Sequence, residues 1–240
     1  MKIDRPRILL AALALAACGP ATASTPPAGG SPAPATEGPR QDPAVIAAQL
    51  QRATLPTSPR QANFTWALDE SGARFNGRGV ARFRAPDRFR IDLFGPRGET
   101  YFAAALVDET PRIPASIDQQ RFRFPSPALL WATVGVVRPP STARLVDATS
   151  NADATVVRYD LGTEGTLEYR ARSGVLQSVR RLRGGGVQES IDLEHGPGNG
   201  IRSARYREWN ALRTLNLTLE STNDAASFSE DIWSPPGTAR

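Results

Sequence analysis

The sequence predicts a mainly β protein, in which a curled antiparallel sheet or half-open barrel of about ten or eleven strands carries two short helices. Two observations predict it. From residue 63 onward, apolar side chains alternate with polar ones, which is the period-two pattern of a half-buried strand. Clusters of Gly, Asp, Asn and Ser separate these runs at the spacing of antiparallel hairpins. A sheet of this many strands tends to curl into a barrel or half-barrel.

The N-terminus has the pattern of a bacterial lipoprotein signal peptide. Three basic residues among the first seven positions precede an uncharged apolar run over residues 8–17. This run suits a secretory signal and is shorter than the roughly 20 apolar residues that span a bilayer. The run ends in Leu15-Ala16-Ala17-Cys18, which resembles the bacterial lipobox. That resemblance implies cleavage before Cys18 and attachment of lipid to its thiol.

Cys18 is the only cysteine among the 240 residues, so no intrachain disulfide can form. If it is lipidated, two or more acyl chains, each contributing about 0.8 kcal/mol per buried methylene, would anchor the protein stably. The alternative is an ordinary signal peptide with an unmodified, buried cysteine. We expect a signal peptide over residues 1–17 and a membrane anchor at Cys18.

Residues 18–41 are predicted to form a tether after the lipidated cysteine. Six prolines lie between residues 19 and 41, with almost no large apolar side chains. Such a segment cannot bury enough surface to offset its ordering entropy, and its prolines favour extended geometry at about 3 Å per residue. Gly19 stands where Asp would be the enterobacterial signal for the inner membrane. We therefore expect a location at the outer membrane, facing the periplasm.

The charge of the chain does not indicate a nucleic-acid ligand. The formal net charge is +5, and Lys2 is the only lysine, so nearly all basic residues are arginine. This bias is typical of a GC-rich genome, and no nucleic-acid-binding motif is present. Residues 42–240 have the length of one domain with a sizeable core.

The first folded element is predicted to be a helix over residues 43–53. Asp42 can cap it and Pro43 suits its first position. Apolar residues from Val45 to Leu50 fall near helical spacing, and Pro56 ends the element.

Strands follow from Asn63 to Val107. In the first, Phe64, Trp66 and Leu68 alternate with polar or small residues, and Ser71-Gly72 turns the chain. The next candidates are residues 73–85, where arginines share one face, then 88–94 and 99–107. Later candidates cover residues 119–124, 154–161, 165–171, 175–183, 187–194, 201–209 and 212–221.

One mid-chain segment, Ser126 to Val137, breaks the alternation. Ser126 is cap-like, Pro127 falls in the first turn, and apolar residues lie nearly all round. The segment is therefore predicted to be a short helix that stops before Pro139.

Several of these motifs together resemble the LolA/LolB superfamily of periplasmic lipoprotein carriers and receptors, including its uncharacterised lipoprotein relatives. They are Trp66, Gly77-Arg78-Gly79, the stretch from Pro86-Asp87-Arg88-Phe89 to Gly95-Pro96-Arg97-Gly98, and Leu129-Leu130-Trp131 with Gly135 and Pro139. The resemblance implies a curled sheet around a hydrophobic cavity with short helices as a lid. It also implies that lipid or lipoprotein acyl chains are bound, and that a periplasmic carrier protein is a partner.

The candidate ligand-binding residues are apolar side chains on one face of the early strands and on the mid-chain helix. They are Phe64, Trp66, Phe89, Ile91, Leu93, Phe102, Leu106, Leu129, Leu130, Trp131 and Val134. The alternative is that they are plain core residues, because alternating aromatics are ordinary in a packed sheet.

The sequence also departs from the superfamily pattern. A LolB-type receptor uses an exposed apolar loop residue between early strands to insert acyl chains into the membrane. Here the Ser71-Gly72 turn carries no such residue, and Phe94 is followed directly by Gly95-Pro96.

Enzymatic and metal functions find little support in the sequence. His195 is the one histidine, no Gly-x-Ser-x-Gly motif is present, and a lipidated Cys18 cannot be a nucleophile. Asp192, Glu194 and His195 lack a recognised metal-ligand spacing, and Gly184-Gly185-Gly186 is predicted to be a hairpin turn. We expect no catalysis, metal or cofactor. A hydrolase with His195 beside a Ser or Asp remains an alternative.

The arginine face at Arg74, Arg78, Arg82 and Arg84 has two interpretations, a site for anionic lipid headgroups or a solvated outer strand face. The function we expect is a membrane-anchored lipoprotein that binds lipid or lipoprotein acyl chains, with a LolB-like role in localisation or transfer. The alternative is a non-catalytic structural or envelope-assembly lipoprotein that binds a protein partner.

Overall fold

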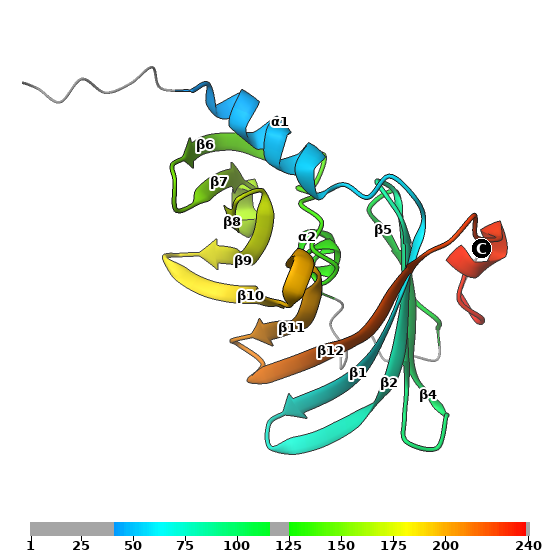
Figure 1. Ribbon diagram of the computed structural model, residues 1–240. Helices are drawn as coiled ribbons and strands as arrows, with labels where there is room; N and C mark the ends of the chain where they lie inside the picture. Colours follow the sequence, from blue (N-terminus) through cyan, green and yellow to red (C-terminus); the bar gives the residue numbers. More distant parts are fainter. Residues whose placement is uncertain (1–40, 116–124, 239–240) are drawn as a thin grey trace, which may run out of the picture. The chain divides into compact units, whose positions relative to one another are not determined.

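Twelve antiparallel strands form one continuous sheet in the order β5-β4-β3-β2-β1-β12-β11-β10-β9-β8-β7-β6 (Figure 1). The computed structural model describes residues 41–115 and 125–238. The predicted signal peptide, Cys18, most of the predicted tether and the predicted strand at residues 119–124 lie outside these ranges. The strands are β1 (Arg60–Glu70), β2 (Ala73–Arg84), β3 (Arg88–Phe94), β4 (Thr100–Val107), β5 (Thr110–Arg112), β6 (Arg144–Ser150), β7 (Thr155–Asp160), β8 (Thr166–Arg172), β9 (Val175–Arg183), β10 (Gly186–His195), β11 (Ile201–Glu208) and β12 (Arg213–Asp224).

The mainly β prediction is confirmed, and the sheet is open. Its order runs from β5 at one edge to β6 at the other, so it does not close into a barrel. The strand count exceeds the prediction because β5 and β6 were not foreseen. Register shifts interrupt the ladders at several points, including residues 63–64 of β1 and 93–94 of β3. Such bulges bend a strand and increase its twist, which lets a long sheet curl.

Aromatic side chains on the concave face pack over glycines of the neighbouring strand. Phe64 lies opposite Gly79 and Trp66 opposite Gly77. A Cβ on Gly79 would lie 2.2 Å from Cε2 of Phe64. The Trp66 indole Nε1 donates to the carbonyl oxygen of Arg78 at 2.9 Å. The glycines of β2 thus make room for the rings that fill the core.

Helix α1 (Pro43–Thr54) covers the β6 end of the sheet (Figure 1). Its predicted start is confirmed, because the Asp42 carboxylate accepts from the Ala44 N–H at 2.8 Å and Pro43 occupies the first turn. The buried face contains Ile46, Ala47 and Leu50 and packs on β6, β7 and β9.

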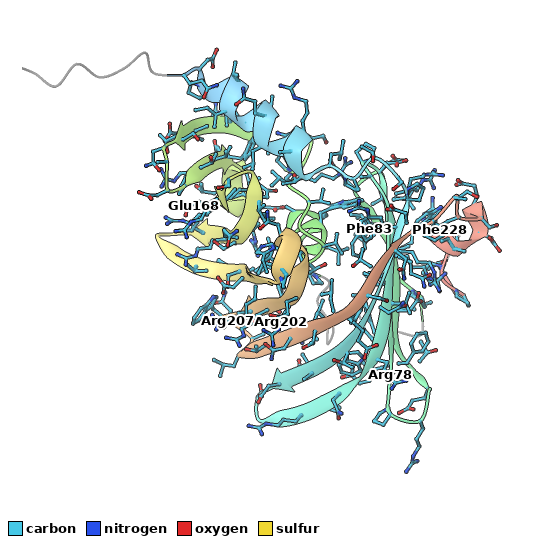
Figure 2. The ribbon with its side chains drawn as sticks, viewed as in Figure 1. Arg78, Phe83, Glu168, Arg202, Arg207 and Phe228 are labelled. Carbon is cyan, nitrogen blue, oxygen red and sulfur yellow. The ribbon has the colours of Figure 1, made fainter. Side chains whose placement is uncertain are left out.

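The C-terminal segment packs on the convex face of the other half of the sheet. Its short 3-10 helix η3 (Glu230–Trp233) contacts β3 and β4, and Trp233 is fully buried. Phe228 packs edge-on against Trp233 with ring centroids 5.7 Å apart (Figure 2). Among the described residues, no helix is long and apolar enough to cross a membrane.

Candidate functional site

Helix α2 (Pro127–Ala132) lies on the concave side of the sheet and is almost entirely buried. It contacts β9 and β10, while its Trp131 ring packs against Phe89 of β3, with centroids 5.3 Å apart, and against Phe83 of β2. Because β3 and β10 lie far apart in the sheet order, α2 links the two halves of the curled sheet.

The helix is shorter than predicted and has no side-chain cap at its start. It ends at Ala132 rather than Val137, and Gly135 follows in the left-handed region at φ +79°. The cap-like Ser126 makes no side-chain capping hydrogen bond, and its buried Oγ has no partner among the residues that the structure describes. The buried indole Nε1 of Trp131 likewise has no partner within residues 41–115 and 125–238. Each unpaired buried polar group costs about 1–3 kcal/mol, so α2 is held less firmly than its burial suggests.

An apolar pocket lies between α2 and the strands β1, β3, β4, β11 and β12; we call it the α2 pocket. Its volume is about 40 Å³. Its lining residues are Leu68, Ile91, Leu93, Phe102, Pro125, Leu130, Thr133, Tyr206, Arg213, Leu215 and Leu217. Ligand pockets of drug-sized molecules measure roughly 300–1,000 Å³, so this pocket is far too small for a whole acyl chain.

The structure brings four of the eleven candidate residues, Ile91, Leu93, Phe102 and Leu130, to the lining of the α2 pocket. Phe64 and Val134 line a neighbouring space of about 10 Å³. The other five, Trp66, Phe89, Leu106, Leu129 and Trp131, are buried in the same core cluster.

Sequence reasoning missed several pocket residues. Leu68, Leu215 and Leu217 follow the alternation of β1 and β12, which was the available signal. Tyr206 follows the alternation of β11, where it lies between Arg205 and Arg207. Arg213 had no such signal, because an arginine on a strand normally indicates its outer face.

A buried network of charged and polar side chains lies on the concave face where Tyr206 and Arg213 reach the α2 pocket. Its members are Glu70, Arg181, Glu189, Tyr206, Glu208 and Arg213. The Tyr206 hydroxyl donates to Glu189 Oε1 at 2.8 Å, and Arg181 Nε pairs with Glu189 Oε2 at 2.7 Å. Arg213 pairs with Glu208 at 3.1 Å and with Glu70. Burial and the neighbouring carboxylates raise the pKa of Tyr206, so its phenol stays protonated and keeps donating.

His195 is held by backbone carbonyl groups. Its Nε2 lies 2.8 Å from the Leu176 oxygen and its Nδ1 lies 3.2 Å from the Asn199 oxygen. Both ring nitrogens face backbone carbonyl oxygens, and a neutral imidazole can donate to one of the two. Within residues 41–115 and 125–238, no group of three or more His, Cys, Asp or Glu is arranged to hold a metal ion.

Three of the four arginines on the outer face of β2 have carboxylate partners. Arg74 pairs with Asp69 at 3.2 Å, and Arg82 with Asp92 at 3.2 Å. Arg84 pairs with Glu230 of η3 at 2.9 Å. This ion-paired surface fits the outer-face interpretation better than a headgroup site.

The Gly184-Gly185 stretch, read as a hairpin turn, does connect β9 to β10, with φ values of +57° and +80°.

Exposed apolar side chains gather at the turn between β11 and β12. Leu212 is 75% exposed and Trp209 is 50% exposed. Leu212 has φ +48°, an uncommon conformation for a leucine, and its carbonyl accepts from the Ser71 N–H at 3.4 Å. The β1–β2 turn lacks an exposed apolar residue, and the adjacent β11–β12 hairpin therefore carries two. We call the pair Trp209 and Leu212 the exposed tip.

The protein is thus an open, curled antiparallel sheet with a short helix buried on its concave face. Solved structures with the same fold show which class of fold this is. A LolA superfamily protein from Nitrosomonas europaea superposes with a TM-score of 0.56 at 9% identity, covering 80% of this chain and 97% of that one. A domain from Vibrio parahaemolyticus named for outer membrane lipoprotein sorting gives 0.54 at 9% identity, covering 78% and 94%. No protein-family model and no curated protein sequence matches the chain. The chain has the fold of the LolA superfamily, as its motifs indicated.

Proposed function

We propose that this protein is a non-catalytic, membrane-anchored periplasmic lipoprotein that binds an acyl chain in the α2 pocket. The observation that carries the proposal is the pocket itself, an apolar space beneath a weakly held helix. Its place on the concave face of a LolA-superfamily fold adds support. Each methylene that leaves water for such a site contributes about 0.8 kcal/mol.

Binding a whole chain requires α2 to move. The pocket, at about 40 Å³, exceeds the volume of one water by little. Helix α2 has six residues, no side-chain cap at Ser126 and a Trp131 indole without a partner among the described residues, all of which lower the cost of displacing it. In this proposal, an incoming acyl chain takes the space that α2 vacates.

The proposed location is supported by the sequence pattern at the N-terminus. A lipid on Cys18 would hold the domain at the outer membrane, facing the periplasm, where a periplasmic carrier protein could deliver an acylated cargo. A LolB-like role in localisation or transfer is the finer part of the proposal. Intact-mass measurement of the membrane-extracted protein, compared with a Cys18→Ala variant, tests the anchor directly.

The binding proposal is tested by native mass spectrometry of residues 19–240, exported behind a cleavable signal peptide so that no anchor of its own competes. We expect co-purified phospholipid or acyl adducts. Leu215→Phe, which fills the α2 pocket from a half-buried position, should remove them. Val146→Phe, at a 60% exposed position on β6, is the matched control and should keep them. A clean mass for the wild-type chain, with no uptake of an added fluorescent fatty acid, contradicts acyl binding.

The exposed tip favours a second candidate function, that of an envelope-assembly lipoprotein binding a protein partner. Trp209 and Leu212 form the kind of apolar, aromatic patch that anchors interfaces. This candidate predicts that Trp209→Ser with Leu212→Ser abolishes a crosslinked partner in vivo while acyl uptake is absent from the wild-type chain.

A further inference from the structure

The sheet splits along one seam, between β11 and β12. β12 pairs with β1 along its whole length, as far as Asp224, but with β11 only over residues 213–218. β11 instead continues along β10 to Ile201. Past Thr218, no described strand therefore pairs with the edge of β12 that faces β11. Beyond its last pair at Ser203, β11 has only two more residues, as far as Ile201.

Two bulges at the same level account for the split. The β1–β12 register passes from Ser221 to Leu219, so Glu220 is the extra residue in β12. The β10–β11 register passes from Ser203 to Ile201, so Arg202 is the extra residue in β11 (Figure 2). A bulge bends its strand and ends regular pairing, and two opposed bulges turn β11 and β12 apart.

A groove of about 400 Å³ occupies this split; we call it the seam groove. Leu219, Thr222 and Asp224 of β12 line one side, and Gly200 and Ile201 line the other. Val134 and Gly135, which follow α2, are also among its lining residues. Its volume, unlike that of the α2 pocket, falls within the range of roughly 300–1,000 Å³ that ligand sites occupy.

The space of about 10 Å³ described above lies between the seam groove and the α2 pocket. That space shares Val134 and Leu219 with the seam groove, and Thr133 and Leu217 with the α2 pocket. The two residues after α2, Thr133 and Val134, thus separate an open groove from the buried apolar pocket. A shift of α2 would join them into one passage.

The rim of the seam groove is polar and carries both signs of charge. Arg60 Nε lies 2.9 Å from Asp224 Oδ1, and the Ser58 hydroxyl donates to the same oxygen at 2.8 Å. The Arg60 and Asp224 side chains are 40% and 67% exposed, so both stay within reach of a ligand. His195 lies on the opposite side of the groove.

We propose that a single-tailed amphiphile binds through the seam between β11 and β12. Its polar, preferably zwitterionic, head stays in the seam groove near Arg60 and Asp224, and its acyl tail passes Thr133 and Val134 into the space beneath α2. This proposal rests on the acyl binding proposed above and adds the route, the headgroup site and the single-tailed class of ligand. A lysophospholipid and an acylated peptide share this chemistry.

The test is to fill the groove without touching the α2 pocket. Gly200 has an ordinary φ of −65° and no atom within 4 Å of an added Cβ, so Gly200→Trp introduces no backbone strain and occupies the groove. Thr222→Trp, at an exposed strand position on the opposite wall, is the second filling variant. Gly186→Trp in the β9–β10 hairpin is the matched control, because the nearest atoms to its added Cβ lie 3.8 Å away.

Residues 19–240 of each variant are mixed with fluorescent lysophosphatidylethanolamine or with a fluorescent N-palmitoyl peptide, and association rates are measured. We expect at least tenfold slower uptake in Gly200→Trp and Thr222→Trp, unchanged uptake in Gly186→Trp, and wild-type unfolding temperatures. Slowing for only one probe identifies which source of acyl chain uses the seam. Wild-type uptake in both filling variants overturns the seam proposal and leaves acyl binding standing. No uptake by the wild-type chain overturns both.

Discussion

Leu130→Ala should lower the stability of the protein and raise its affinity for acyl chains. Leu130 is buried on α2 and lines the α2 pocket, so shortening it enlarges the one space that a chain is proposed to fill. Leucine-to-alanine changes in cores cost about 2.7–5.0 kcal/mol, and the cost grows with the cavity left behind. Because one side of Leu130 already faces the pocket, we expect a loss near the lower end, about 3 kcal/mol.

The expected gain in binding follows from the same atoms. The variant frees space for about three methylenes of a ligand tail, each contributing about 0.8 kcal/mol. The sum, about 2 kcal/mol, corresponds to roughly thirtyfold tighter binding. Stability is measured by urea unfolding and affinity by titration with a fluorescent fatty acid.

Leu167→Ala is the matched control, because Leu167 is fully buried on β8 and does not line the α2 pocket. It should cost about 4 kcal/mol and leave affinity unchanged. If Leu130→Ala binds no more tightly than the wild type, or if both variants tighten equally, the α2 pocket is not the acyl site.

Three further predictions concern the framework around the site. Arg213→Met should cost about 3–5 kcal/mol in urea unfolding, because it leaves Glu208, only 7% exposed, without its buried cation. Gly165→Ala should cost about 3 kcal/mol in thermal unfolding, since φ is +101° and the new Cβ would lie 1.9 Å from the Leu182 oxygen. Tyr206 should make the protein sensitive to alkali. Folding raises the pKa of its phenol, so the phenol ionises first in the unfolded chain. Its contribution to the free energy of unfolding is therefore complete below about pH 10 and declines above it by about 1.4 kcal/mol per pH unit.

Each of these predictions has its own control. Adding Glu208→Gln to Arg213→Met should restore part of the lost stability, and no restoration argues against an unpaired carboxylate as the cause. Gly184→Ala, with φ +57° and open space around it, should cost about 1 kcal/mol, so a loss equal to that of Gly165→Ala refutes the clash. Tyr206→Phe should be less sensitive above pH 10 than the wild type. An identical alkaline slope shows that another group is responsible.

The strands were predictable where a local pattern and the tertiary environment agree. In β1 the alternation of Phe64, Trp66 and Leu68 gives an alternating burial pattern in the folded chain. In β6 the local pattern and the tertiary environment disagree. Its sequence mixes Val146, Asp147 and small residues, and a register shift between Leu145 and Asp147 leaves Val146 exposed. An edge strand with an interrupted alternation carries little period-two signal, so β6 was missed.

The site was predictable only in its apolar composition. Candidate residues of β3 and α2 are buried in the core cluster, but nothing local distinguishes a residue beside a void from one in a filled core. The length of α2 depends on Gly135 and on how that glycine packs against Ile201. A Cβ added at Gly135 would lie 2.8 Å from Cδ1 of Ile201. The seam depends on two bulges in strands far apart in the sequence, Glu220 in β12 and Arg202 in β11. Such register shifts arise from pairing across the whole sheet, and single-sequence periodicity cannot reveal them.

If the protein carries the proposed lipid anchor, the two margins of the described sheet, β5 and β6, bear on how densely it can be packed on a membrane. Lipid-anchored molecules share a plane, where exposed backbone N–H and C=O groups invite pairing between neighbours. At one margin β5 has only three residues, and its Pro111 has no N–H to donate. At the other, the bulge at Val146 interrupts β6, and α1 packs alongside it. Both margins are thereby poor templates for a further strand, and we expect neighbouring molecules to remain separate even at high surface density.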